Sequence, residues 1–328
     1  IYGVHDIILQ QEAAMRFLLE GKNPYKETYF ETPLKDWHYG ELGKDAVNPA
    51  FYHFVMPPWY LIFPFLFYMI SIPVLGYFDG RMVLLFCLFG TLLIVLRWFK
   101  NPALGRIAGA LIALSPGIAP YFIEGRSDAF ALFWLVWSLY LLEKKKLFWS
   151  AFVFALDLLS KQTIWFIVPF YGIYLRAAQK YSWKRMLPYV GVTAVTFAAG
   201  ILPFLLWDAK AFIDSIILYL SGGTSTGYPV SGYGLGMMLY EFEVIKDIHA
   251  YYPFVLWQLL LGVPALIWMI RYLLAKPRMS RLLIGYAVTL LVVWYVSRYF
   301  NNSHVTYIGT LLILGVLKDR DERLYEET

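Results

Sequence analysis

The sequence predicts an all-α polytopic membrane protein, and its composition, its apolar segments and its basic connectors each support this prediction. Of the 328 residues, 59% are hydrophobic and 16% are charged, and the mean hydropathy is +0.55. Soluble domains carry about 25% charged residues, so a chain this apolar indicates a membrane protein. The net charge of +5 is spread over many loops, which argues against a nucleic-acid partner.

Long apolar stretches recur along the chain. Several are shorter than the ~20 residues that a span usually needs, so these must be tilted or include flanking residues. We expect about nine of them to cross the bilayer, and one further N-terminal span to precede residue 1. The apolar stretches are residues 57–78, 83–99, 104–123, 129–142, 147–160, 162–175, 187–207, 254–270, 282–297 and 304–317.

Lys and Arg are concentrated in alternate connectors between these stretches. Seventeen of the 28 basic residues lie in 97–106, 144–146, 176–185, 271–281 and the tail from Lys318, whereas the connectors between them hold five. Cytoplasmic loops of membrane proteins carry such an excess of Lys and Arg. We therefore predict that the first set is cytoplasmic and the second extracytoplasmic, in a multi-pass protein of the plasma membrane or the ER.

The first apolar stretch, residues 57–78, is expected to lie along the outer membrane surface. The next stretch, 83–99, ends at a cytoplasmic connector, so its beginning and the residues before it lie outside. Proline interrupts helical hydrogen bonding. This stretch contains four prolines, at Pro57, Pro58, Pro64 and Pro73. We predict an interfacial or re-entrant helix with Trp59 and Tyr60 at headgroup depth.

The connector from 208 to 253 is the longest, and glycine- and serine-rich text such as Ser221–Pro229 is typical of loops. Its length favours a substrate-gating loop, although a plain flexible connector explains it equally well. The chain thus divides into an external loop with interfacial helices (1–82), a core transmembrane module (83–207), the gating loop (208–253), C-terminal transmembrane helices (254–317) and a cytoplasmic tail (318–328).

The first external loop opens with an ionisable pair, His5 and Asp6, before a short helical pattern at 7–19. Asp6 stands where a helix cap would stand, which is its simplest role. A carboxylate laid against a membrane bundle also suits a general base that acts on a lipid-linked substrate. His5 is the rival base, and Asp36 and Asp45 are further acids in this loop.

Charged residues also occur at the outer ends of predicted spans, at Arg126, Asp128, Lys161 and Arg298. Headgroup anchoring explains each of them alone, but cations that face a headgroup zone together are what a phosphate-linked lipid requires. Asp157 precedes Lys161 by four residues, so on one helix the two side chains would pair. A carboxylate inside a span is also a functional candidate by default.

No motif indicates a metal or a nucleotide. The sequence has no Walker A motif, no paired CxxC and no HExxH, and its five histidines lack ligand spacing. The glycine-rich text at 232–236 follows no predicted strand, so a dinucleotide site is not supported. Cys87 is the single cysteine, which excludes an internal disulfide.

Several short motifs occur in an order that is found in a known family. An early Asp is followed by Gly-Lys-Asn-Pro-Tyr at 21–25 and by Pro-Pro-Trp-Tyr at 57–60. Gly-Arg-Ser-Asp at 125–128 opens the fourth span, and Ser-Lys-Gln at 160–162 precedes a short span with Pro169. With the large external loop after the seventh span, this order resembles the GT-C membrane glycosyltransferases, most of all the branch that uses polyprenyl-phosphate mannose. The resemblance covers essentially the whole chain.

The resemblance implies roles for particular residues. Asp6 matches the family's catalytic acid, Lys161 matches the basic residue that holds the lipid-linked phosphate, and Arg126 with Asp128 matches the charged opening of the fourth span. The position two after Asp6 is Ile8, so the family's paired-acid motif is incomplete. We therefore expect no bound metal and no other cofactor.

The implied reaction is an inverting transfer of mannose or another hexose from a polyprenyl-phosphate donor to a lipid-linked, glycan or protein acceptor. The acceptor hydroxyl would lose its proton to Asp6, while Lys161, Arg126 and Arg298 neutralise the departing phosphate. Aromatic rings suit stacking on a sugar face, although interface anchoring explains them as well. The supporting residues expected near the site are His5, Asp128, Asp157, Tyr25, Tyr52, His53 and Trp59.

Two other classes of protein fit the composition, a polytopic transporter or lipid flippase and a non-catalytic membrane scaffold. A carrier places charged residues near the midplane and often shows inverted repeats. Only Asp157 points that way, and no repeat is visible. A scaffold requires neither the early Asp nor the basic residues at the outer helix ends.

Overall fold

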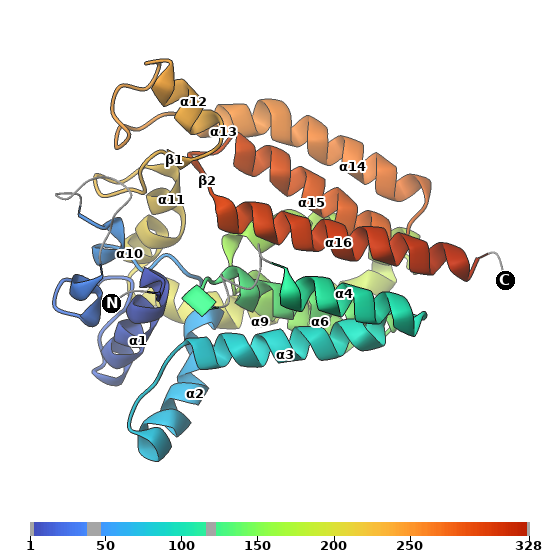
Figure 1. The fold of residues 1–328 in the computed structure, drawn as a ribbon, viewed down its shortest axis with the longest axis horizontal. Coiled ribbons are helices and arrows are strands. Elements are labelled where there is room, and N and C mark those ends of the chain that lie inside the picture. Colours follow the sequence, from blue (N-terminus) through green and yellow to red (C-terminus); the bar gives the residue numbers. More distant parts are fainter. Residues whose placement is uncertain (1–2, 38–46, 116–122, 327–328) are drawn as a thin grey trace.

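The computed structural model describes residues 3–37, 47–115 and 123–326. Apart from one short parallel strand pair, the regular structure in these ranges is helical. Long helices lie roughly parallel to one another, and the N-terminal segment lies at the end of this bundle that is remote from the C-terminus (Figure 1). The prediction of an all-α protein is confirmed.

The bundle consists of long helices joined mostly by short connectors. Its described helices are α3 (Arg81–Trp98), α4 (Pro102–Leu114), α6 (Asp128–Glu143), α7 (Leu147–Leu158), α8 (Val168–Ala177), α9 (Trp183–Trp207), α14 (Val263–Ala275), α15 (Met279–Tyr295) and α16 (Asn302–Leu324). α6 packs against α3 and α7, α7 against α9, and α15 against α14 and α16. Successive helices return along the bundle, so the connectors lie at alternate ends (Figure 1).

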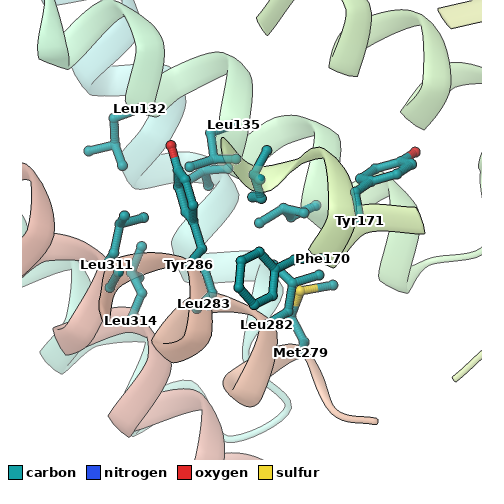
Figure 2. Close-up of a cluster of buried hydrophobic side chains, with 14 of the residues drawn as sticks. Leu132, Leu135, Phe170, Tyr171, Met279, Leu282, Leu283, Tyr286, Leu311 and Leu314 are labelled. Atoms are coloured by element: carbon teal, nitrogen blue, oxygen red, sulfur yellow. The ribbon is translucent and has the colours of Figure 1, made fainter. Parts of the chain in front are cut away.

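Buried apolar side chains fill the centre of the bundle. Tyr286 of α15 is fully buried and lies beside Leu132 and Leu135 of α6 (Figure 2). The neighbouring Gly285 makes room for Phe170 of α8, because an added Cβ would lie 2.8 Å from the Phe170 ring. Between helices in a bilayer, such close packing contributes more to stability than the removal of surface from water.

Three of the described helices are long and apolar enough to cross a membrane: Arg81–Trp98, Trp183–Trp207 and Phe254–Ala275. They carry exposed apolar side chains, such as Leu85 and Phe89 on α3, that a lipid environment would cover. The structure thus supports a helical membrane protein. The other apolar helices, including α4, α7 and α15, are shorter than a full span, so nine spans and their sidedness stay predictions.

Helix α2 (Trp59–Leu75) leaves the bundle at a steep angle to α3 (Figure 1). It contains Pro64 and Pro73 and ends at Gly76, whose φ of +76° suits a residue without a Cβ. Its outer part exposes apolar side chains such as Val74. This orientation supports the predicted position along the membrane surface, which stays a prediction.

Short elements cover the end of the bundle where α1 lies. These and the remaining elements are α1 (Asp6–Leu19), η1 (Pro33–Asp36), η2 (Pro49–Phe51), η3 (Gln162–Ile167), α10 (Ala209–Ile213), η4 (Asp214–Leu218), α11 (Tyr219–Ser221), β1 (Ser231–Gly232), α12 (Leu235–Glu241), α13 (Phe254–Trp257), η5 (Gln258–Gly262) and β2 (Tyr299–Phe300). η4 and η5 are π-helical, a form that often occurs at functional sites.

The 208–253 connector is more ordered in its backbone than its glycine and serine content predicted. It contains short helices, and β1 pairs in parallel with β2, which aligns Ser231 with Tyr299. The Arg298 guanidinium also donates hydrogen bonds to three backbone carbonyls of the connector. The connector is thus fastened to the segment between α15 and α16, and it is not a plain irregular loop. Its gating role stays a prediction.

Candidate functional site

A cavity of about 230 Å³ lies where α1 meets the end of the bundle. Its wall combines residues of α1, the segment before α6, the α7–η3 connection, α11 and the start of α16. It therefore brings together residues from the two ends of the sequence. The ionisable side chains in its wall include His5, Asp6, Arg126, Asp128, Lys161 and His304.

The first turn of α1 is held in place by a backbone hydrogen bond and by two glycines. The His5 N–H donates to the Glu124 carbonyl over 2.6 Å. Ile8 fits against Gly80 and Gly125, where an added Cβ would lie 3.0 Å and 2.4 Å from Ile8 side-chain atoms. Gly125 also has a φ of +92°, which glycine adopts without strain. A side chain at either glycine would displace the residues that open α1.

Asp6 lies between His5 and Asn48 in the cavity wall. Its Oδ1 is 2.6 Å from His5 Nδ1, and its Oδ2 accepts a hydrogen bond of 3.1 Å from Asn48 Nδ2. Burial raises the pKa of Asp6, but the attraction of His5 and the hydrogen bonds from His5 and Asn48 outweigh it and hold the pKa below its usual value. Asp6 is therefore ionised at neutral pH.

The capping role suggested for Asp6 is wrong. Helix α1 begins at Asp6, and the N-cap position belongs to His5, whose Nδ1 lies 3.3 Å from the Ile7 nitrogen. A negative charge in the first turn still interacts favourably with the helix dipole. The Asp6 side chain instead contributes to the cavity wall.

Lys161 forms an ion pair with Asp128 and not with Asp157. Its Nζ lies 2.6 Å from Asp128 Oδ1 and donates to Ser127 Oγ over 3.2 Å. The predicted Asp157–Lys161 pair is wrong because α7 ends at Leu158 and Lys161 has an extended backbone, with φ −159° and ψ 140°. Residues four apart face each other only within a helix.

Asp157 is fully buried in α7 and lies outside the cavity. Within the described residues, neither of its carboxylate oxygens has a hydrogen-bond partner. A buried polar group without a partner costs stability. Asp157 therefore differs from Asp6 and Asp128, which both have partners in the cavity wall.

The two arginines predicted to bind phosphate lie in different places. Arg126 lines the cavity, and its Nε lies 3.0 Å from Glu124 Oε2. Arg298 does not line it, and instead borders a neighbouring cavity of about 430 Å³. Because the Arg298 guanidinium donates to the backbone carbonyls of the 208–253 connector, its position supports a structural role rather than the predicted phosphate contact.

Three aromatic residues predicted to support the site also lie outside the cavity. Tyr25 is buried among phenylalanine rings and donates its hydroxyl to the Met56 carbonyl over 2.9 Å. Tyr52 packs edge-on against a phenylalanine, and Trp59 packs against a tryptophan of α6. Their packing within the protein explains these rings, and stacking on a sugar in the cavity is not supported.

His53 connects the first segment to the 208–253 connector. Its ring nitrogens lie 3.4 Å from Ser215 Oγ and 2.8 Å from Thr226 Oγ1. Burial lowers the pKa of His53 despite the attraction of Asp214, so the ring is neutral near pH 7. Its ring also lies 5.0 Å from that of Tyr219, a wall residue. His53 thus packs against a residue of the cavity wall and does not line the cavity itself.

The aromatic part of the cavity wall consists of residues that the sequence reasoning missed, namely Trp37, Tyr219, Tyr228 and Tyr299. The rings of Tyr228 and Tyr299 are in contact, with centroids 4.7 Å apart. Tyr228 lies in the glycine- and serine-rich text, which was a partial signal. His304 was also missed, because a lone histidine before an apolar stretch has no spacing that marks it.

No group of three or more His, Cys, Asp or Glu side chains is placed to hold a metal ion within the part of the chain that the structure describes. His38 and Asp45 lie outside these residues, so the expected absence of a metal or cofactor stays a prediction. Asp36, a further candidate base, is exposed in η1 and does not line the cavity.

Together the fold and the cavity define a helical protein with candidate membrane spans and a charged site at one end of its bundle. Comparisons with known protein families, with curated proteins and with solved structures find no match. The similarity to GT-C enzymes therefore rests on the order of the sequence motifs.

Proposed function

We propose that this chain is an integral membrane glycosyltransferase, which moves mannose or another hexose from a polyprenyl-phosphate donor to a lipid-linked, glycan or protein acceptor. One observation supports this above all: the His5–Asp6 pair shares a cavity with two cations, Arg126 and Lys161. Glycosyl transfer needs a group that accepts the proton of the attacking hydroxyl and positive charge for the departing phosphate. A single displacement inverts the anomeric centre.

The geometry around Lys161 leaves capacity for a phosphate. An ammonium group has three N–H donors, and the contacts with Asp128 and Ser127 use two of them. Arg126 adds a guanidinium, which can bind phosphate oxygens in pairs. The cavity of about 230 Å³ is smaller than the ~300–1,000 Å³ of sites for drug-sized ligands. It suits the sugar-phosphate head, while the lipid chain stays in the membrane.

The test is transfer by the purified full-length chain from a panel of radiolabelled polyprenyl-phosphate sugars to a lipid extract that supplies acceptors. We expect one donor to be consumed and its lipid phosphate to be released. Lys161→Ala should abolish most of the transfer, whereas Lys210→Ala should not, because the Lys210 side chain is 87% exposed. If wild type consumes no donor in the panel, the proposed activity is refuted.

The proposal also places the site on the extracytoplasmic side of a bundle with about nine spans. The poorly basic connectors lie at the same end of the bundle as the cavity, which agrees with the positive-inside rule. Single cysteines placed beside Pro57 and Asp79, in a Cys87→Ser background, should both react with an impermeant reagent from outside. Labelling from opposite sides would show that α2 crosses and would place Asp6 in the cytoplasm.

A transporter or lipid flippase is the second candidate, and Asp157 is the observation that favours it. A buried carboxyl without a protein partner inside a bundle is a feature of proton- and ion-coupled carriers. Vesicles that contain the protein would then move a polyprenyl-phosphate sugar across the bilayer without consuming it, and Asp157→Asn would stop this movement. Consumption of the donor together with an active Asp157→Asn variant favours the transferase.

A further inference from the structure

We infer, on the basis of the proposed glycosyl transfer, that His5 takes the proton from the acceptor hydroxyl and that Asp6 positions the imidazole for this task. The resemblance to GT-C enzymes assigns the role of base to Asp6, with His5 as the rival. Three features of the site support the reassignment: a short contact between the two side chains, the occupied oxygens of Asp6, and the greater exposure of His5.

The contact between His5 and Asp6 requires a proton on His5 Nδ1. The 2.6 Å separation from Asp6 Oδ1 is too short for two atoms that both lack a proton, and it is typical of a charge-assisted hydrogen bond. Because Asp6 is ionised, His5 Nδ1 is the donor. In a neutral imidazole only one nitrogen carries hydrogen, so Nε2 holds the lone pair that can accept a proton. The Ile7 N–H also points at Nδ1, over 3.3 Å, and would donate to it if Nδ1 lacked a proton. The contact with Asp6 is 0.7 Å shorter and charge-assisted, so it decides the position of the proton.

Asp6 is poorly placed to act as the base itself. Its Oδ1 accepts from His5, and its Oδ2 accepts from Asn48 over 3.1 Å. A carboxylate oxygen has a second lone pair, so an acceptor hydroxyl could bind Asp6 only by sharing an oxygen with one of these donors. A general base also works best when its pKa lies near the operating pH. The pKa of Asp6 is held below its usual value, so the carboxylate is a weak base at neutral pH.

His5 is the more accessible of the two side chains, with an exposed fraction of 30% against 16% for Asp6. The described residues make no hydrogen bond to its Nε2. Cations and carboxylates balance in number across the cavity, so neither sign dominates around the imidazole. The groups that face His5 are Asp6, the Trp37 ring at 6.4 Å, the Glu124 carbonyl, and Arg126, Asp128, Lys161 and His304 of the cavity wall.

The resulting step is a single displacement at the anomeric carbon. The acceptor hydroxyl gives its proton to His5 Nε2 while its oxygen bonds to the anomeric carbon of the polyprenyl-phosphate sugar. The bond from that carbon to the phosphate oxygen breaks, and its electron pair stays on the lipid phosphate beside Lys161 and Arg126. Asp6 stabilises the imidazolium, which then releases its proton to water. The division between an imidazole base and a carboxylate that orients it follows the logic of the Ser-His-Asp enzymes.

Transfer rates of the purified full-length variants provide the first test. We expect His5→Ala and His5→Gln to lose ~10²–10⁴-fold in rate, the range of general-base contributions, while they still bind the donor. Imidazole added to the buffer should restore part of the His5→Ala rate, which it would not do if His5 had only a structural role. His249→Ala removes an exposed histidine and is the matched control, with no expected loss.

The pH profile and the tautomer of His5 provide the second test. With an imidazole base, the transfer rate of wild type should fall as pH decreases through the range in which histidines usually titrate, about 5 to 8. Nitrogen-15 NMR of histidine-labelled protein should place the proton of His5 on Nδ1 in wild type. Asp6→Asn should shift this tautomer and lower the rate without weakening donor binding, as expected of a positioning residue.

Several outcomes would overturn the inference. A His5→Gln enzyme that stays active while Asp6→Asn is inactive assigns the base to Asp6, as does a wild-type rate that stays flat between pH 5 and pH 8. If the His5 variants fail to fold, a His5 tautomer that Asp6→Asn leaves unchanged refutes the positioning role in a folded protein. A wild-type chain that transfers no sugar from any donor refutes the proposed function itself, and the flat profile or unchanged tautomer refutes only the role of His5.

Discussion

Two lysines with carboxylate partners lie near opposite ends of the same bundle, and they differ in what surrounds them. Lys318 of α16 is 2% exposed, and its Nζ lies 2.9 Å from the Trp98 carbonyl, 3.1 Å from Glu143 and 3.5 Å from Asp321. Lys161 contacts one carboxylate, and it borders a cavity. The first lysine is enclosed by protein groups, and the second has a side that faces open space.

This difference distinguishes a structural ion cluster from a candidate binding site. Asp321 accepts hydrogen bonds from the backbone nitrogens of Lys100 and Asn101, over 3.0 Å and 2.8 Å, so the Lys318 cluster ties α16 to the connector between α3 and α4. Its donors and acceptors satisfy one another. At Lys161, the described residues leave a third N–H and an adjoining cavity for a ligand. The Lys318 side chain is 2% exposed and that of Lys161 is 14% exposed, and the cavity next to Lys161 accounts for the difference.

The largest effect is expected from breaking the enclosed cluster. Lys318→Ala leaves Glu143 and Asp321 without their buried cation, and removal of one partner of a buried pair typically costs about 3–5 kcal/mol. We expect the free energy of unfolding in detergent to fall by about this amount, with activity lost only in proportion to unfolded protein. Arg320→Ala, on the exposed side of the same helix, is the control. A Lys318→Ala protein as stable as wild type would show that the cluster does not hold α16.

The second effect is expected at the open site and concerns catalysis. Lys161→Ala removes a charge that faces the departing phosphate, and the loss of one such donor typically costs about 10²–10³-fold in rate. Because the change also leaves Asp128 unpaired, the double variant Lys161→Ala, Asp128→Asn separates charge loss from destabilisation. Donor binding measured on both variants should be weak. Normal binding by the double variant would remove Lys161 from the phosphate site.

The sequence predicted where helices lie along the chain, because long apolar stretches are visible in composition alone. Each predicted apolar stretch overlaps a helix within the described residues. The contact between Lys161 and Asp128 could not be predicted in the same way. It depends on where α7 ends, and a break after Leu158 turns Lys161 away from the helical position opposite Asp157. A one-turn difference in a helix end decided which carboxylate the lysine meets.

The site was predicted in part for a related reason. Asp6, Arg126 and Lys161 were predicted from their charge on the expected outer side and from the resemblance, and they line one cavity. Arg298 is also a charged residue at the expected outer side. Its guanidinium donates hydrogen bonds to carbonyls of the 208–253 connector, and the sequence contains no signal for the fold of that connector. Tyr299 was missed because aromatic residues are common throughout this chain. Charge marks a candidate site in a membrane sequence, whereas packing decides which charges belong to it.

A third effect, of opposite sign, is expected at Asp157. Unlike Lys318, this buried group has no hydrogen-bond partner among the described residues, and a buried unsatisfied group costs about 1–3 kcal/mol. Asp157→Leu, which keeps the branched skeleton and replaces the two oxygens with methyl groups, should therefore raise the free energy of unfolding by about this amount and leave sugar transfer intact. A gain in stability with loss of activity would give Asp157 a functional role. A loss of stability would indicate that the carboxyl has a bound partner such as water.

The smallest expected effect is the pH dependence of stability that Asp6 causes at the cavity. Burial raises the pKa of Asp6, but its contacts with His5 and Asn48 lower it further, so the folded pKa lies below the unfolded value. A carboxylate of this kind contributes stability that is present in full above the unfolded pKa, near 3.9. That contribution is lost as the pH falls through the folded pKa.

Wild type should therefore lose stability more steeply than Asp6→Asn when the pH is lowered below about 4. Thermal unfolding in detergent at closely spaced pH values measures this difference, with Glu31→Gln as a control at an exposed acid of the same segment. Parallel curves throughout would mean that His5 and Asn48 do not hold Asp6 in its charged form. Such a result would also argue against the hydrogen bond that orients His5. It would not bear on the Lys318 cluster, because no residue of that cluster contacts Asp6 within the described chain.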